Sequence, residues 1–285
     1  MKLECRIEEL KNAISQAERV TGKNLTLPIL GSILLIADNK KLILRATNLS
    51  LGVEIEVPAK IEKEGSMAIS GSSLHGVFSN FFQNESVNLE GVDGNLLVYT
   101  KKNKIKLKGQ PVEDFPTIPK VSGESFEIEG TKFALGIKSV YYSSSVSDIK
   151  PEISSVFIYT KDDNMVFVST DSFRLAEKKK KVKNFPEILG ILIPYKNISE
   201  ILRIFGDYVG ILKVSFNKNA ISFSSSSVYL TSRVIDGIFP DYNQIIPKQF
   251  TTTAIVLKQD LSNALKLSNI FSDKFNQVNL SVRPK

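Results

Sequence analysis

Apolar residues near the N-terminus first alternate with polar ones and then recur at helical spacing. The alternating residues are Leu3, Cys5 and Ile7. The residues that follow at intervals of three or four are Leu10, Ala13, Ile14 and Ala17. Alternate side chains share one face of a strand, and every third or fourth side chain shares one face of a helix. The pattern therefore predicts a short strand followed by a helix.

The same succession returns twice along the chain. In the second copy the alternating and then helical residues are Phe126, Ile128, Phe133, Ile137 and Val140. In the third copy they are Ile255, Leu257, Leu261, Ala264, Leu265 and Ile270. At the spacing that relates residues 10 and 133, Thr47 and Asn48 return as Thr170 and Asp171. A repeat of this length is a whole domain, and we expect the third copy to be incomplete in this chain.

The later half of each complete copy predicts a helix among strands. One helix is expected over 72–82, with Ser72 or Ser73 as its N-cap, and another over 197–205, with Pro194 near its start. Strands are expected at 96–99, 105–107, 214–216, 221–223 and 228–234, with turns at 93–94 and 217–219. Each repeat is thus an α+β domain of two helices packed on antiparallel sheets.

Two proline-bearing segments separate the repeats. Phe115 and Pro116 open the first, Phe239 and Pro240 open the second, and each segment ends in Ile-Pro-Lys. Proline fixes φ and removes a donor, so these segments are expected to be stiff, extended connectors. We place the domains at 1–121, 122–248 and 249–285.

Cysteine usage and the N-terminus bear on the compartment. The single cysteine excludes an intrachain disulfide, in keeping with a reducing cytosol. The first residues carry charges where a signal peptide has its apolar core, and the most apolar stretch, 29–37, is too short to span a bilayer. We expect a soluble, cytoplasmic protein with no membrane partner.

The net charge of +7 and pI near 9.2 are typical of a protein with a polyanionic partner. A lysine-rich composition alone would also explain them. Basic residues recur, however, on the expected helices of several copies, off the apolar stripes. A solvated helix face accounts for any single one of them, but the recurrence favours contacts with DNA phosphates. The positions that we expect to make those contacts are Lys23, Lys150, Lys196 and Arg203.

Residues for catalysis are sparse. The chain has one histidine, His75, one cysteine, and no glycine-rich phosphate loop, and its carboxylates lack the spacing of a metal site. Asp171 and Ser172 could form an acid–nucleophile pair, but the recurrence of Thr-Asn as Thr-Asp predicts a turn instead. We expect a non-enzyme that needs no cofactor or metal.

Three motifs together resemble those of the bacterial sliding clamps, the β subunits of DNA polymerase III. They are Thr-Leu-Pro-Ile-Leu-Gly at 26–31, Thr-Asp-Ser-Phe-Arg-Leu-Ala at 170–176, and Val-Ile-Asp-Gly-Ile-Phe-Pro-Asp-Tyr at 234–242. The segment 271–275 also resembles the start of the family's third domain. The resemblance implies tandem clamp domains in an arc or ring, with helices lining a hole for duplex DNA. It implies a homodimer when full length, which gives the replicative polymerase processivity.

The resemblance also implies that partners dock a short peptide beside the second domain. The partners expected are a polymerase subunit, a clamp loader and other proteins with clamp-binding peptides. The matching positions are Ile153, Thr170, Ser172, Arg174, Leu175, Pro240 and Ile245. Such a set suits an apolar slot with a few polar groups. Ser172 and Phe173 replace the Gly-His that is common in the family, which predicts a bulkier rim.

Two further sets of positions follow from the resemblance. The positions that match DNA-contacting loops are Lys23, Asn24, Ser147 and Lys150. The positions expected at the dimer interface are Ile105, Leu107, Asn269 and Ile270. With an incomplete third domain, we expect this chain to be unable to close a ring. The alternative is a truncated clamp paralogue that binds peptides or DNA without forming a ring, and a hydrolytic enzyme is a more distant third.

Overall fold

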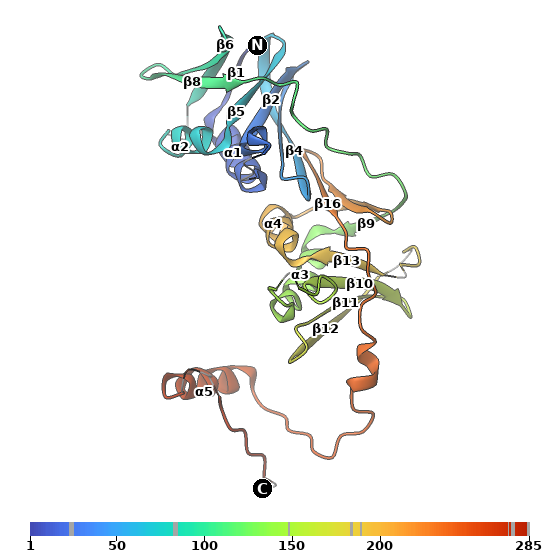
Figure 1. Ribbon diagram of the computed structural model, residues 1–285. Coiled ribbons are helices and arrows are strands. Elements are labelled where there is room, and N and C mark those ends of the chain that lie inside the picture. Colours follow the sequence, from blue (N-terminus) through green and yellow to red (C-terminus); the bar gives the residue numbers. More distant parts are fainter. Residues whose placement is uncertain are drawn as a thin grey trace. The chain divides into compact units, whose positions relative to one another are not determined.

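A computed structural model describes residues 1–22, 26–81, 85–147, 149–182, 185–188, 190–272, 274 and 277–283. The chain forms two compact parts, Met1–Pro240 and Asp241–Lys285. The first part contains both complete repeats (Figure 1). The second contains the start of the third copy.

The first repeat is a succession of strands interrupted by two helices. Its strands are β1 (Lys2–Arg6), β2 (Ser32–Asp38), β3 (Lys41–Thr47), β4 (Leu51–Lys63), β5 (Gly65–Ser70), β6 (Ser86–Val92), β7 (Asn95–Tyr99) and β8 (Lys104–Gln110). Its helices are α1 (Ile7–Val20), α2 (Gly71–Ser79) and the 3-10 turn η1 (Pro28–Gly31). The expected strand and helix at the N-terminus are confirmed, and Leu10, Ala13, Ile14 and Ala17 are all buried.

The second repeat follows the same order. Its strands are β9 (Glu124–Glu129), β10 (Ser155–Lys161), β11 (Asn164–Thr170), β12 (Leu175–Lys181), β13 (Ile191–Pro194), β14 (Ile211–Phe216), β15 (Ala220–Ser224) and β16 (Val228–Arg233). Its helices are α3 (Gly130–Lys138), α4 (Tyr195–Phe205) and the 3-10 turn η2 (Tyr141–Ser143). The predicted α+β class with antiparallel sheets is confirmed, because every strand pairing in the described residues is antiparallel.

The helix expected over 72–82 is shorter than predicted, and its cap is different. The structure places it at Gly71–Ser79, and the N-cap is Ser70, whose hydroxyl accepts a hydrogen bond from Ser73 N at 3.4 Å. The prediction of Ser72 or Ser73 as cap was wrong, because β5 runs up to Ser70 and the backbone leaves the extended conformation only there. Phe81, expected within the helix, follows it and is still buried against Phe78.

The two repeats differ in how their sheets close. In the first, β1 pairs with both β6 and β4, and β5 pairs with β8, so the eight strands form a closed cycle. In the described part of the second, no pairing joins β9 to β12 or β13 to β16. β4 has 13 residues, whereas β12 has 7. The segment after β12 contains Pro186, which cannot donate to a ladder. There the ring of Phe185 packs on Phe126, with centroids 4.5 Å apart, instead of pairing.

One strand pair joins the repeats. β4 pairs with β16 over Leu51–Ile55 and Val228–Ser232, so one 12-stranded sheet crosses from the first repeat into the second. A four-stranded sheet, β12-β11-β10-β13, completes the second repeat. The helices α2, α1, α4 and α3 follow one another along this part (Figure 1). The joint therefore continues both the sheet and the helix layer.

The first proline-bearing segment is fixed against this joint. Ile118 is buried, and a Cβ at Gly52 would lie 3.0 Å from it. The Tyr229 hydroxyl donates to the Pro119 carbonyl at 2.9 Å and accepts from Val121 N at 2.9 Å. Lys120 pairs with Glu54 and lies 3.7 Å from the centroid of the Tyr229 ring. The expectation of an ordered connector is confirmed for this segment.

The second part contains the 3-10 turn η3 (Tyr242–Ile245) and α5 (Lys258–Ile270). The helix expected in the third copy is therefore present. The strand expected over Ile255 and Leu257 is absent from the described residues, and both side chains are exposed. A strand needs a partner for its backbone groups, and the described residues of this part contain no other strand. The domain boundaries drawn from the sequence stay a prediction.

Candidate nucleic-acid and peptide interface

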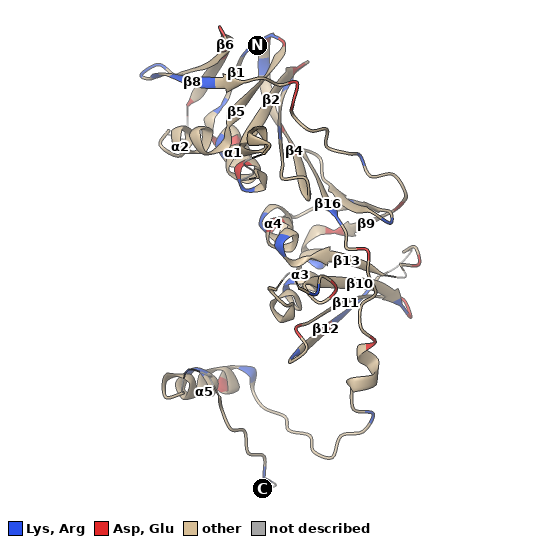
Figure 2. Cartoon of the chain, in the orientation of Figure 1, with Lys and Arg blue, Asp and Glu red and all other residues tan. Residues whose placement is uncertain are grey.

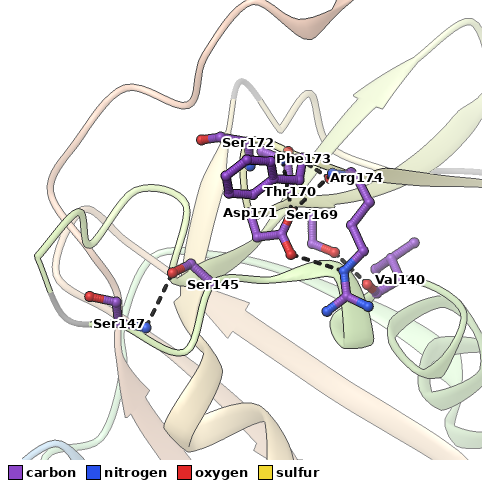
Figure 3. A network of polar contacts seen from close by, with 9 residues as sticks. All are labelled: Val140, Ser145, Ser147, Ser169, Thr170, Asp171, Ser172, Phe173 and Arg174. Carbon is purple, nitrogen blue, oxygen red and sulfur yellow. Dashed lines mark hydrogen bonds and ion pairs between the residues drawn. The ribbon is translucent and has the colours of Figure 1, made fainter. Parts of the chain in front are cut away.

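A rigid turn follows β11 at the residues expected to bind peptides (Figure 3). The Thr170 hydroxyl accepts a hydrogen bond from Ser172 N at 3.1 Å and donates to the Arg174 carbonyl at 2.8 Å. Asp171 Oδ1 accepts from Phe173 N at 3.0 Å and from Arg174 N at 2.9 Å. The prediction that Thr-Asp forms a turn is confirmed. Because that carboxylate is committed to the backbone, Asp171 is not arranged as the base of a nucleophile.

The same hydrogen bonds lower the pKa of Asp171. Partial burial opposes its ionisation and is the largest single influence. The hydrogen bonds from Arg174 N, Phe173 N and the Arg174 guanidinium, together with the positive charge of that guanidinium, outweigh it and lower the pKa of Asp171. Arg174 Nε lies 2.9 Å from Asp171 Oδ2, while more than half of the Arg174 side chain stays exposed. The turn therefore exposes the Arg174 guanidinium, and its ion pair with Asp171 holds that group in position.

The tip of the turn projects into solvent. Ser172 has φ +76°, a left-handed conformation that favours glycine. Phe173 is 99% exposed, next to the Arg174 side chain. An exposed aromatic ring on a hydrogen-bonded turn is a ready contact for a ligand, because little conformational freedom remains to be lost on binding.

The other expected peptide residues lie nearby or in the second part. Leu175 begins β12 directly after the turn and is half-buried, as is Ile153 just before β10. Pro240 is held in place by Phe239, whose ring stacks on Phe157 at 4.8 Å. Phe157 in turn pairs with Val168 on the strand that ends at Thr170. Ile245 is 69% exposed and belongs to Asp241–Lys285.

Four of the six residues expected to contact DNA are described, and they lie on one loop and one helix. Lys23 and Asn24 fall outside the described residues. Ser147 and Lys150 are exposed on the loop after η2, where the Lys150 carbonyl accepts from Ser154 N at 3.1 Å. Lys196 and Arg203 are exposed on α4, two turns apart. Figure 2 colours the basic positions along this helix blue.

That loop and the start of α4 enclose a cavity of about 190 Å³, which the sequence did not indicate. Its lining includes Ser145, Pro151, Tyr195 and Lys196. Tyr195 N donates to the Ser154 carbonyl at 2.9 Å, and the Tyr195 ring stacks on Tyr141 at 6.2 Å. The structure thus brings Lys196 beside the loop that carries Lys150. No periodic pattern links these residues, because their contact depends on tertiary packing.

Several basic helix residues have partners that the sequence analysis overlooked. Arg203 pairs with Glu200 at 2.6 Å, and Lys132 pairs with Glu129 at 2.7 Å. Both acids stand three residues before the base, a spacing that places two side chains together on a helix. These pairs reduce the net positive charge of the helix faces.

Two of the four residues expected at the dimer interface lie on an edge strand. Ile105 and Leu107 on β8 are half-buried against the core of their own repeat, while Lys104, Lys106 and Lys108 are exposed. Figure 2 colours the basic positions of β8 blue. β8 pairs with β7 over Lys104–Lys108 and with β5 only at Gly109 and Gln110, so within the described residues the other edge of 104–108 is unpaired. In the second part, α5 ends at Ile270, which is 72% exposed and follows Asn269.

Groups with catalytic or metal-binding potential are scattered. Cys5 is buried, and burial raises the pKa of its thiol to about 12, which removes it as a nucleophile. His75 is exposed on α2. In the described ranges, no three His, Cys, Asp or Glu side chains are close enough together to hold a metal ion. Nor does any helix of those ranges have the length and apolar character to cross a membrane.

Known proteins with similar sequences are replication clamps. Residues 1–119 match the N-terminal domain of the DNA polymerase III beta subunit, and residues 127–241 match its central domain. The beta sliding clamp of Synechococcus elongatus is 26% identical over 294 residues, which cover 100% of this chain and 78% of that protein. The beta sliding clamp of Rickettsia felis is 27% identical over 292 residues, 99% of this chain and 76% of that protein.

A solved structure shares the fold. The DnaN sliding clamp of Pseudomonas aeruginosa, bound to griselimycin, superposes with a TM-score of 0.91 at 22% identity. The match covers 97% of this chain and 76% of the Pseudomonas clamp. Two consecutive domains of one family thus match the two joined repeats, and similarity to clamps runs along the whole chain. The chain belongs to the bacterial sliding-clamp family, the beta subunits of DNA polymerase III.

Proposed function

We propose that this chain is a non-catalytic processivity subunit which, when full length, encircles duplex DNA as part of a homodimeric ring. It holds the replicative polymerase on DNA by topological linkage rather than by tight binding. The clamp loader, the polymerase and other partners dock short peptides at the turn after β11. The residues that we propose for peptide docking are Ile153, Thr170, Ser172, Arg174, Leu175, Pro240 and Ile245.

The joint between the repeats is the observation that carries this proposal. Antiparallel pairing of β4 with β16 joins two like domains edge to edge and continues the sheet through both. β12 and β8 are the counterparts of β4 and β16 in the other repeat, and each has an unpaired edge among the described residues. Repeating the same joint at these edges is a direct way to extend the arrangement toward a closed ring. On this basis Ile105, Leu107, Asn269 and Ile270 stay candidates for the dimer interface.

The basic loop and helix support the proposed DNA contact. The proposed DNA-binding residues are Lys23, Asn24, Ser147, Lys150, Lys196 and Arg203. A clamp that moves along DNA needs contacts with phosphates rather than with bases, and such contacts release counterions. The affinity should therefore fall steeply with salt, by a slope of about 0.9 per phosphate neutralised on a log–log plot.

Binding to two unrelated duplexes over a range of salt concentrations tests this proposal. We expect equal affinities and a steep salt dependence for both sequences. Replacing Lys196 and Arg203 by serine should reduce the slope, whereas replacing the exposed Lys106 of β8 should leave it unchanged. Retention on circular DNA and loss from linear DNA test encirclement separately. A strong sequence preference, or equal retention on both forms, would count against a sliding ring.

Griselimycin is a practical first probe of the proposed peptide site, because the solved Pseudomonas aeruginosa clamp is bound to it. Saturable binding that short apolar peptides displace would support peptide docking. Binding that such peptides leave unchanged would place the docking site elsewhere.

A further inference from the structure

We propose that the cavity at the joint between the repeats is a second peptide-binding groove, selective for a basic segment with one apolar anchor. The cavity measures about 450 Å³ and is formed by α1, β4, the end of α4 and the turn before β16. None of the residues proposed above for DNA, peptide or dimer contacts lines it.

The groove exists because β4 changes partners. β4 pairs with β16 up to Ile55 and with β1 from Ala59 onward. Glu56 N still donates to the Ser227 carbonyl at 2.8 Å, but Pro58 has no N–H to donate. A wedge therefore opens between the two repeats at this point. Neighbouring cavities of about 720 and 500 Å³ also include Pro58 in their lining, so the wedge extends along the strand.

The lining is apolar at the bottom and polar at the rim. Ala13, Ile55, Val57 and Phe205 are buried core residues that reach the cavity. Small-molecule and peptide sites commonly have about 300–1,000 Å³, with apolar walls and a few polar groups that fix orientation. The floor therefore has room for one aliphatic or aromatic side chain of a partner.

The polar groups of the rim come mainly from one face of α1. Glu9, Asn12 and Gln16 follow one another at helical spacing along the cavity, and Tyr208 faces them from beyond the end of α4. These side chains can accept hydrogen bonds from an ammonium or guanidinium group.

Charge at the groove selects a cation. Glu9 has no ion-pair partner within 4.0 Å among the described residues, and it stands in the first turn of α1, where a helix N-terminus stabilises a carboxylate. Glu56 adds a second carboxylate, already paired with Lys41 at 2.6 Å. The turn after β11 differs from the groove in charge, because it exposes the positive Arg174 side chain rather than a carboxylate.

Three capped dipeptides test the proposal without changing the protein. The 285-residue chain is titrated with acetyl-Phe-Lys-amide, up to about 10 mM because such small ligands bind weakly, while backbone amides are followed by NMR. Shifts are expected at Ala13, Tyr208 and Ser227, and none at Phe173. Acetyl-Phe-Glu-amide should bind at least about fivefold more weakly, and acetyl-Ala-Lys-amide at least about tenfold more weakly. Equal binding of all three, or no shifts at these residues, would overturn the proposal.

A matched pair of charge reversals locates the site. Glu9→Lys should weaken acetyl-Phe-Lys-amide binding by about fivefold or more at low salt. Glu8→Lys makes the same change one residue earlier, at an exposed position that does not line the cavity, and should leave binding unchanged. Equal losses in both variants would mean a general charge effect, and would overturn the assignment of Glu9 to the site.

Discussion

The turns after β3 and β11 have the same internal hydrogen bonds but different surroundings. In the first repeat, the Thr47 hydroxyl donates to the Leu51 carbonyl at 2.8 Å, and Asn48 Oδ1 accepts from Ser50 N at 2.9 Å and Leu51 N at 2.8 Å. In the second repeat, the Thr170 hydroxyl likewise donates to the carbonyl four residues ahead. Asp171 Oδ1 accepts from the backbone N–H groups two and three residues ahead. Leu49 and Ser172 share the left-handed conformation, with φ +72° and +76°.

The difference lies in what covers each turn. The Ser50 carbonyl accepts from Arg233 N at 2.8 Å, and Asn197 Nδ2 donates to the Ser50 hydroxyl at 3.0 Å, so the second repeat closes over the first turn. At the equivalent position of the second turn, Phe173 is 99% exposed. One local structure is therefore covered at the joint in one repeat and exposed in the other, where we propose peptide binding. The sequence of the turn alone does not decide between these uses.

Removing the Asn197 side chain should damage the joint most. Asn197 is 4% exposed and donates to the Ser232 hydroxyl at 2.8 Å as well as to Ser50. Asn197→Ala removes the hydrogen bonds to Ser50 and Ser232 at a buried position, so we expect a loss of about 1–3 kcal/mol in the free energy of unfolding. Urea denaturation measures it. Ser199→Ala, on the same helix, should cost less than about 0.5 kcal/mol. Equal losses would mean that the joint does not depend on Asn197.

Leu175→Asp should remove peptide binding at the exposed turn after β11. The change places a charge where a partner's apolar side chain is expected, and burying one such side chain contributes about 1.5–3 kcal/mol. We expect at least a tenfold loss of affinity for a labelled peptide with Leu and Phe side chains, measured by fluorescence polarisation. Circular dichroism should be unchanged. Leu51→Asp, at the covered turn after β3, should instead unfold the protein, because Leu51 is 2% exposed. Unimpaired peptide binding by the Leu175 variant would contradict the site.

Sequence patterns predicted the helices, strands and turns better than the way in which the strands assemble into sheets. Alternation and helical spacing located the strands and helices of both repeats, because Leu10 and Phe133 lie on buried helix faces whose period is visible in the sequence. The Thr-Asx pairs predicted both turns for the same local reason. The difference between the closed first repeat and the open second repeat could not be predicted, because it depends on the length of β4 in the first and on Pro186 after β12 in the second.

The candidate site was less predictable than the fold. The positions at 170–175 came from a family resemblance rather than from any pattern, and their peptide-binding role is still untested. The cavity beside Lys196 and the groove beside Glu9 are built from segments that are distant in sequence. Their contacts arise from packing, which leaves no periodic trace. The strand expected at Ile255 failed for a related reason, since a strand exists only with a partner.

Low pH should change the conformation of the turn after β11, which contains Asp171, and leave the turn after β3, which contains Asn48, unchanged. The pKa of Asp171 is lowered in the folded state, so its stabilising effect is present above the unfolded value near 3.8 and is lost as the pH falls through the folded value. Asn48 has no charge to lose. We expect the amide signals of Phe173 and Arg174 to shift in NMR spectra below about pH 4, where carboxylates protonate, and those of Ser50 and Leu51 to stay. In Asp171→Asn, which keeps the Oδ1 acceptor, this pH dependence should disappear. Persistent shifts would point to another group.

The smallest effect expected is that of Ser172→Gly. A side chain in the left-handed region costs about 1–2 kcal/mol, which glycine avoids. Glycine also gives the unfolded chain more freedom, and this opposes the gain by about 0.5–1 kcal/mol. The free energy of unfolding should therefore change by less than about 1 kcal/mol, and peptide affinity should change little. Ser172→Val is the control, because a β-branched residue at φ +76° should destabilise the turn clearly. Thermal denaturation of both variants decides the matter: equal destabilisation would show that Ser172 does not hold the conformation that it shares with Leu49.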